Sequence, residues 1–293
     1  MAAGVIAAAP APAGGVAAAG AAPAAVAPAR GVPARATAAP ADVAFTFARD
    51  LARLGPRPAA SAAERRAHAR VERAFAAAGL RLGHDRFTVP GLGRSRNVLG
   101  IRDVPASCLV VVMAHADTVP PAPGADDNAS GLGALVALAQ DPRLAAPACD
   151  LWLVATGAEE RIHTGRPDHL GASALVRRVR RLGRADDLRF ALSLDEVGRG
   201  TTFWLRSTAA APRAGVERAL LRAARRAGTT VRWVRDSGDG NSDHREFGLA
   251  GLRAMKLGVP DDPCRHTACD APERLERRAF ARVLRAVVPV LSG

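Results

Sequence analysis

The sequence predicts an α/β protein, a layered domain with a largely parallel central sheet. Two observations support this fold class. Continuous apolar runs that turn polar at their ends, typical of strands buried on both faces, occupy residues 108–117, 150–160, 190–198 and 252–260. Segments with helical periodicity separate these runs, and such alternation of strands and helices is the pattern of a layered α/β domain.

The segments before the first core strand predict two helices and two short strands. Residues 42–55 and 64–79 carry apolar side chains at helical spacing, and each segment ends in glycine. Residues 86–91 and 96–103 read as strands bounded by proline or glycine. The later helices are expected at 130–140, 169–183, 214–228 and 272–291. No internal repeat and no second domain boundary are visible.

Residues 1–40 contain little besides alanine, proline, glycine and valine. Such a composition builds no packed element, and its prolines interrupt helices. We expect a disordered or signal-derived segment, followed by a catalytic domain over residues 41–293. A signal peptide needs an early basic region, whereas the first basic residue here is Arg30, so the signal pattern is incomplete. The remainder holds no run long and apolar enough to span a membrane.

The chain is strongly basic, with 41 basic and 28 acidic residues and a net charge of +13. This balance can indicate nucleic-acid binding. The arginines are spread over several expected helices rather than gathered in one stripe, and Lys256 is the only lysine. We therefore expect solvated helix faces and no nucleic-acid partner.

Four cysteines and no CxxC motif exclude zinc-finger and thioredoxin-like sites. Their even number permits two disulfides if the protein is exported. Cys108 and Cys149 each precede an expected strand and could bridge neighbouring strands, whereas Cys264 and Cys269 flank His266 and could fix its loop. Four free thiols are the alternative.

Residues that can bind metal occur where the expected strands end, which is where open α/β sheets place their ligands. They are His115 and Asp117, the Asp126–Asp127 turn, Glu159 and Glu160, Asp195, and His266 after the last strand. So many carboxylates at one edge would repel one another unless cations compensated them. Imidazole mixed with carboxylates, without thiolates, suits zinc.

A carboxylate-rich set of this kind suits two metal ions about 3.5–4 Å apart that share a bridging carboxylate. Such a pair needs a free carboxylate nearby as general base. Glu159 is placed for this role beside Glu160.

The motifs HAD, GADDNASG, GAEE, LDEVG, SDH and RHTACD, in this order, strongly resemble those of the M28 family of zinc aminopeptidases over residues 42–293. The resemblance implies a three-layer α/β/α sandwich around a mixed, mostly parallel sheet. It implies that His115, Asp127 and Asp195 hold one Zn²⁺. It implies that Asp127, Glu160 and His266 hold the other, with Asp127 bridging and Glu159 acting as general base. It further implies that Asp117 orients His115 and that the Asp127–Asn128 peptide is cis.

Three features depart from the family pattern. Many members use a tyrosine to steady the oxyanion, but this chain has none. Arg265 could supply that donor instead, or it could face solvent or an acidic side chain. Glu196 stands where a large apolar residue is common; it could bind a substrate amino group, but we expect it at the surface. His163 and His169, in the long loop after GAEE, could line the rim of the pocket, but they too are expected at the surface.

These observations predict a metallo-exopeptidase that removes N-terminal residues from peptides, using a hydroxide bridged by two zinc ions. Two alternatives stay open: a glutaminyl cyclase-like acyltransferase with one zinc, and a non-catalytic basic binding protein with a structural metal site. We expect a monomer, secreted or associated with the cell envelope, with a cytoplasmic location as the alternative.

Overall fold

The structure is a computed structural model that describes residues 38–160 and 168–293. The expectations about the start of the chain and about His163 lie outside these residues. The helices are α1 (Pro40–Ala52), α2 (Ala62–Ala77), α3 (Gly131–Gln140), α5 (Leu170–Arg181), α6 (Glu217–Arg226), α7 (His244–Leu249) and α8 (Arg277–Leu291). None of the described helices is long and apolar enough to cross a membrane.

Eight strands form one sheet in the order β1-β2-β4-β3-β5-β8-β6-β7. They are β1 (Arg81–Val89), β2 (Gly93–Arg102), β3 (Leu109–His115), β4 (Asp150–Thr156), β5 (Leu188–Leu194), β6 (Thr202–Ser207), β7 (Thr230–Arg235) and β8 (Ala254–Gly258). Four of the seven strand pairings are parallel, which confirms the expected mixed, mostly parallel sheet.

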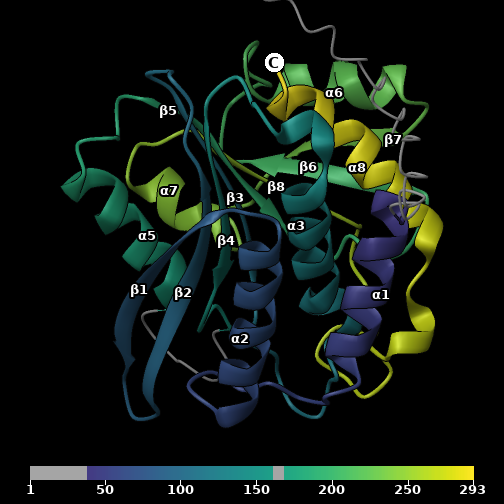
Figure 1. Cartoon of the computed structure of the whole chain (residues 1–293). Coiled ribbons are helices and arrows are strands. Elements are labelled where there is room, and N and C mark those ends of the chain that lie inside the picture. Colours follow the sequence, from purple (N-terminus) through teal and green to yellow (C-terminus); the bar gives the residue numbers. More distant parts are fainter. Residues whose placement is uncertain (1–37, 161–167) are drawn as a thin grey trace, which may run out of the picture. The chain divides into compact units, whose positions relative to one another are not determined.

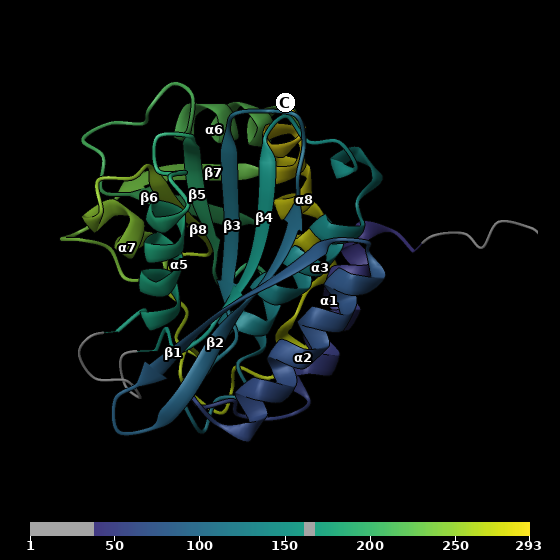
Figure 2. The same ribbon diagram turned by 60° about the vertical axis from the view of Figure 1, so that its left-hand side comes forward.

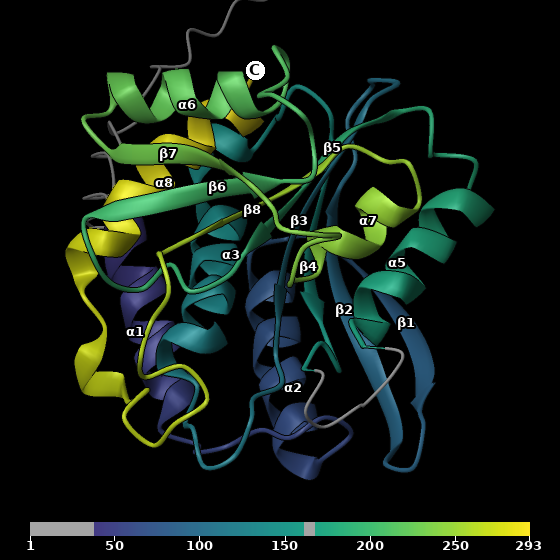
Figure 3. The ribbon, with the colours of Figure 1, turned by 180° about the vertical axis from the view of Figure 1, so that it is seen from behind.

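Helices cover both faces of the sheet. Figure 1 shows α1, α2, α3 and α8 gathered on one side, and α5 and α7 on the other. The reverse view in Figure 3 shows α5 and α7 in front of the sheet. The packing agrees, since α3 contacts β3 and β4, whereas α7 contacts β5 and β8. The α/β/α layering is therefore confirmed.

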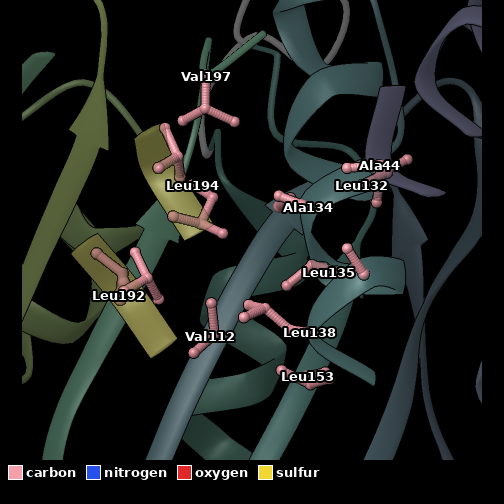
Figure 4. Close-up of a cluster of buried hydrophobic side chains, with 14 of the residues drawn as sticks. Ala44, Val112, Leu132, Ala134, Leu135, Leu138, Leu153, Leu192, Leu194 and Val197 are labelled. Carbon is pink, nitrogen blue, oxygen red and sulfur yellow. The ribbon is translucent and has the colours of Figure 1, made fainter. Parts of the chain in front are cut away.

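Strand β3 divides the core between these two faces. Its side chains alternate, because successive residues of a strand point to opposite sides of the sheet. Val110 and Val112 pack into the larger core cluster, whereas Val111 and Met113 pack into the second one. Figure 4 shows Val112 in the larger cluster, near Leu138 of α3. Burial on both faces explains the unbroken apolar run of this strand.

The sequence patterns gave no indication of β6, β7 and α7. Strand β7 lies at the edge of the sheet, and its side chains are exposed or only partly buried. An edge strand therefore carries arginines between its apolar residues and lacks the continuous run that identifies a central strand. Helix α7 has six residues, too few for a periodic pattern to emerge.

The start of α2 is fixed by the side chain of the N-cap residue Ser61 and by a hydrogen bond from the residue before the cap to Glu64. The Ser61 hydroxyl accepts a hydrogen bond from Glu64 N at 3.1 Å, and the Glu64 carboxylate accepts one from Ala60 N at 2.8 Å. The same carboxylate accepts hydrogen bonds from Ser95 Oγ at 2.8 Å and from Ala158 N at 3.1 Å. Glu64 thus connects α2 and β2 to the segment that follows β4.

His68, on α2, gives the fold a pH-dependent stability. Burial lowers its pKa from 6.5 to about 4, although a hydrogen bond with Thr156 O opposes the change. In the unfolded chain His68 is therefore protonated below pH 6.5, whereas in the folded chain it stays neutral down to about pH 4. Stability should fall as the pH drops through this window, by ~3 kcal/mol in total.

Urea unfolding of the wild type and of His68→Gln between pH 4 and 7 measures this contribution. The variant keeps a donor for Thr156 O but cannot titrate, so the free energy of unfolding should depend less on pH. Equal pH slopes in the two proteins would contradict the prediction.

Candidate active site

The side chains that can bind metal lie at one edge of the sheet, where three neighbouring strands end. His115 is the last residue of β3. Glu159 and Glu160 follow β4, and Asp195 directly follows β5. Because β4, β3 and β5 are parallel neighbours, their carboxyl ends meet at the same edge. Side chains from distant parts of the sequence therefore converge there.

Two further residues reach this edge from loops. Asp127 lies in the short helical turn Ala125–Ser130 before α3, and His266 lies in the loop after β8. The Asp127–Asn128 peptide bond is cis, as the resemblance implied. Both side chains, together with the four from the strand ends, line one cavity of about 190 Å³.

The Asp127 carboxylate lies between the two histidines. Its Oδ1 is 3.1 Å from His115 Nε2, and its Oδ2 is 3.2 Å from His266 Nε2. His266 Nε2 is also 3.1 Å from Glu160 Oε2, and His115 Nε2 is 3.5 Å from Asp195 Oδ1. Two sets of side chains that could bind metal, each with one histidine and one further carboxylate, thus share Asp127.

The electrostatics of the cavity fit a divalent cation. Burial, and then the charge of Asp127, raise the pKa of Glu160 to about 8. Asp195 Oδ2 accepts a hydrogen bond from Lys256 Nζ at 2.7 Å, whereas Asp195 Oδ1 is buried without a hydrogen-bond partner among the described residues. A buried acceptor without a donor, beside carboxylates that repel one another, is satisfied by a bound metal ion.

Asp117 is fully buried and supports the site in two ways. The main-chain oxygen of Asp117, rather than its carboxylate, lies 3.1 Å from His115 Nδ1. The carboxylate instead accepts hydrogen bonds from Glu159 N at 3.1 Å and from Glu160 N at 3.0 Å. Asp117 therefore holds the backbone that carries the Glu159–Glu160 pair as well as contacting His115.

Sequence reasoning missed two supports of the Asp127 turn. The Asp270 carboxylate accepts hydrogen bonds from Asp126 N at 2.8 Å and from Asp127 N at 3.1 Å. Asp270 ends the motif RHTACD, but the motif gave it no role. The buried Arg57 guanidinium donates to the main-chain oxygens of Ala116, Pro123 and Gly124. Arg57 belongs to no motif that could have identified it.

The expectation that His169 lies at the surface is wrong. His169 is only 3% exposed and lines the cavity. Its Nε2 is 3.1 Å from Glu159 Oε1, and its main-chain N donates to Glu159 O at 3.1 Å. The start of α5 at Leu170 turns this residue toward the cavity, which the loop sequence alone does not show. His169 thus holds both the backbone and the carboxylate of Glu159.

The expectation that Glu196 lies at the surface is also wrong, because Glu196 is 1% exposed. Its carboxylate accepts hydrogen bonds from Arg265 Nε at 2.9 Å and from Arg265 Nη2 at 2.5 Å. Lys256 Nζ lies 3.7 Å away. The two cations compensate the buried charge, and the bidentate pair fixes the Arg265 guanidinium at the cavity wall.

All four cysteines form disulfides, so the alternative of free thiols is wrong. Cys108 and Cys149 join the segments that lead into the adjacent strands β3 and β4. Cys264 and Cys269 close the loop that carries His266. Disulfides are typical of oxidising compartments and indicate a location outside the cytoplasm.

Solved structures with the same fold include two kinds of enzyme. A leucine aminopeptidase precursor from Bacteroides thetaiotaomicron aligns with a TM-score of 0.76 and 21% identity, over 86% of this chain and 97% of that one. BSAP, a zinc aminopeptidase from Bacillus subtilis, aligns with a TM-score of 0.74 and 16% identity, over 85% of this chain and 93% of that one. A Bacteroides thetaiotaomicron glutaminyl cyclase bound to N-acetylhistamine aligns with a TM-score of 0.75 and 21% identity, over 86% of this chain and 97% of that one.

These similarities show a zinc exopeptidase-like fold and do not separate the two activities. No protein of curated function matches the chain by sequence. The sequence model of peptidase family M28, however, matches residues 97–291, which is more than half of the chain. That range contains every residue of the candidate metal site described above. The chain therefore belongs to peptidase family M28, a family of zinc-dependent enzymes.

Proposed function

We propose that this protein is a zinc aminopeptidase whose catalytic domain spans residues 41–293. The observation that carries the proposal is the position of Asp127, with one carboxylate oxygen near His115 and the other near His266. His115, Asp127 and Asp195 would hold one Zn²⁺, and Asp127, Glu160 and His266 would hold a second. Bound zinc polarises a carbonyl oxygen and lowers the pKa of water.

Glu159 is the general base in this proposal. It lines the cavity but stands outside the two proposed ligand sets, and so its carboxylate can take a proton from water and pass it to the leaving amine. The contact with His169 Nε2 keeps this carboxylate oriented toward the cavity. Cleavage at the amino terminus is proposed because similar solved structures, 16% and 21% identical, include aminopeptidases.

Arg265 takes the place of the missing tyrosine as the donor to the developing oxyanion. Two of its nitrogens donate to Glu196, which leaves Nη1 outside that pair. Arg265→Met should lower kcat by about 10²-fold with a smaller change in KM, since a donor to the oxyanion acts mainly in the transition state. Steady-state kinetics on an aminoacyl-nitroanilide measure the effect.

Arg199→Met is the matched control, because Arg199 forms its ion pair with Asp262 and lies outside the cavity lining. Glu196→Gln should also lower kcat, but by less than Arg265→Met, because it weakens the ion pair that holds the Arg265 guanidinium in place. Unchanged kcat in Arg265→Met would remove Arg265 from the reaction.

The proposed function is tested by hydrolysis of a panel of aminoacyl-nitroanilides, with chelator and with added zinc. We expect cleavage that chelation abolishes and zinc restores, with two zinc ions per chain. The same preparations are incubated with peptides that begin with glutamine, because the glutaminyl cyclase fold is equally similar. Cyclisation without peptide cleavage, with one zinc per chain, would replace the aminopeptidase by that activity.

The disulfides also support a secreted or envelope-associated enzyme. A secreted peptidase meets oxidising conditions, under which the Cys108–Cys149 and Cys264–Cys269 bonds persist.

A further inference from the structure

A second cavity, of about 480 Å³, lies between α2 and the hairpin of β1 and β2. Among the residues that the structure describes, it shares none of its lining with the active-site cavity. Four of its seven lining residues are arginines: Arg65 from α2, Arg86 from β1, and Arg94 and Arg96 from β2. Figure 2 shows the hairpin extending past the sheet beside α2.

Strand register places this cavity at the same edge of the sheet as the active site. Strands β2 and β4 are antiparallel, with Val98 opposite Ala155 near the carboxyl end of β4. The residues of β2 before Val98, among them Arg94 and Arg96, therefore lie beyond that end. Glu64, which lines the cavity, accepts a hydrogen bond from Ala158 N, one residue before Glu159.

The arginines of the hairpin are crowded in a way that costs stability. Arg86 is directly opposite Arg96 in the register, and Arg94 lies on the same face of β2 as Arg96. Like charges directly opposite each other destabilise a strand pair. Of these three arginines, Arg96 alone has an acidic partner in the described part of the chain, because its Nη2 is 2.8 Å from Glu72 Oε2.

Arg86 and Arg94 make no ion pair or side-chain hydrogen bond among the described residues. The remaining segments, 1–37 and 161–167, contain no aspartate or glutamate that could pair with them. A cleft lined by uncompensated charges of one sign concentrates ligands of the opposite sign.

The floor of the cavity indicates which anion fits. It holds the buried Glu64 carboxylate and His68, whose Nδ1 has no hydrogen-bond partner among the described residues. Because His68 Nε2 pairs with Thr156 O, Nδ1 is left as an acceptor. A phosphodiester has no hydrogen-bond donor to offer to this acceptor. A peptide fits better, since it offers N–H groups to acceptors and carboxylates to the arginines.

We propose that this cavity binds an acidic segment of a peptide, with aspartate or glutamate side chains paired to Arg86 and Arg94. Arg65 and Arg96 add to the positive field on either side. The inference goes beyond the proposed reaction, because it concerns binding away from the candidate metal site and requires no hydrolysis.

The test uses fluorescence anisotropy with a dye-labelled hexaglutamate whose amino terminus is acetylated, so that it offers no free amine to the active site. We expect salt-sensitive binding to the full chain, weakened at least about tenfold in the double variant Arg86→Gln/Arg94→Gln, which equals about 1.4 kcal/mol. The control is Arg222→Gln/Arg226→Gln, which removes the same charge from the exposed face of α6. It should weaken binding by less than about twofold.

Equal weakening by the two double variants would overturn the proposal, because binding would then reflect net charge alone. If a hexanucleotide bound more tightly than the hexaglutamate, and if Arg86→Gln/Arg94→Gln weakened its binding to the same extent, the assignment to peptides would be overturned. Thermal melting of each variant confirms that both are folded. The anisotropy measurement does not depend on hydrolysis of nitroanilides. The absence of aminopeptidase activity and the absence of peptide binding at this cavity can therefore be told apart.

Discussion

Glu159→Gln should lower kcat by about 10³-fold while zinc stays bound, because general base catalysis contributes typically 10²–10⁴-fold. Glutamine keeps the size of the side chain and can still accept from His169, whose Nε2 lies 3.1 Å from Glu159 Oε1. It cannot take a proton from water. Steady-state kinetics on an aminoacyl-nitroanilide, with zinc content measured by mass spectrometry, separate loss of the base from loss of metal.

Glu246→Gln is the matched control, since it removes one carboxylate near His169 without touching Glu159. We expect this control to retain most of the activity. Full activity in Glu159→Gln would show that another group acts as the base. Loss of zinc from Glu159→Gln would instead make Glu159 a metal ligand, since ligand atoms of Glu159, His115 and Asp195 lie within 4.8 Å of one another.

Removal of zinc should lower the melting temperature by about 10 °C. Two ions, each present at about 30 times its Kd, together stabilise the folded state by ~4 kcal/mol, and each kcal/mol moves the melting temperature by about 2–4 °C in a domain of this size. The physical reason is local: without cations the buried carboxylates Asp127, Glu160 and Asp195 repel one another. Scanning fluorimetry with chelator and then with added zinc measures the shift.

Asp127→Ala provides the control for this stability change. It removes the carboxylate that both histidines contact, so added zinc should no longer raise the melting temperature. Identical melting of chelated and zinc-loaded wild type would contradict the metal site itself. A half-sized shift in the wild type, with one zinc per chain, would support a single ion.

Strand ends explain why most of the candidate site could be predicted. A buried parallel strand is a local pattern, and the residues just after it are placed by the sheet whatever surrounds them. His115, Glu160 and Asp195 were therefore found from the sequence, and the structure brings all three to one cavity. The edge strand β7 and the short helix α7 could not be predicted from the sequence, because neither buries enough apolar side chains to produce a periodic pattern.

Long-range contacts explain what could not be predicted. Glu196 and Arg265 are 69 residues apart, and nothing near either one shows that they pair. His169 lies in a loop whose composition suggests solvent exposure, yet the entry into α5 turns it onto Glu159. In both cases a polar residue is buried because a partner from another element compensates it.

The sequence by itself determined the layered α/β fold, the family, and the order of residues that can bind zinc. These properties depend on hydrophobic periodicity and on strand ends, which are local. Only the tertiary structure decided which carboxylates pair with cations, which side chain holds Glu159, and where the arginines of the hairpin gather. Those outcomes depend on strand register and on loop packing, which bring together residues that no local pattern connects.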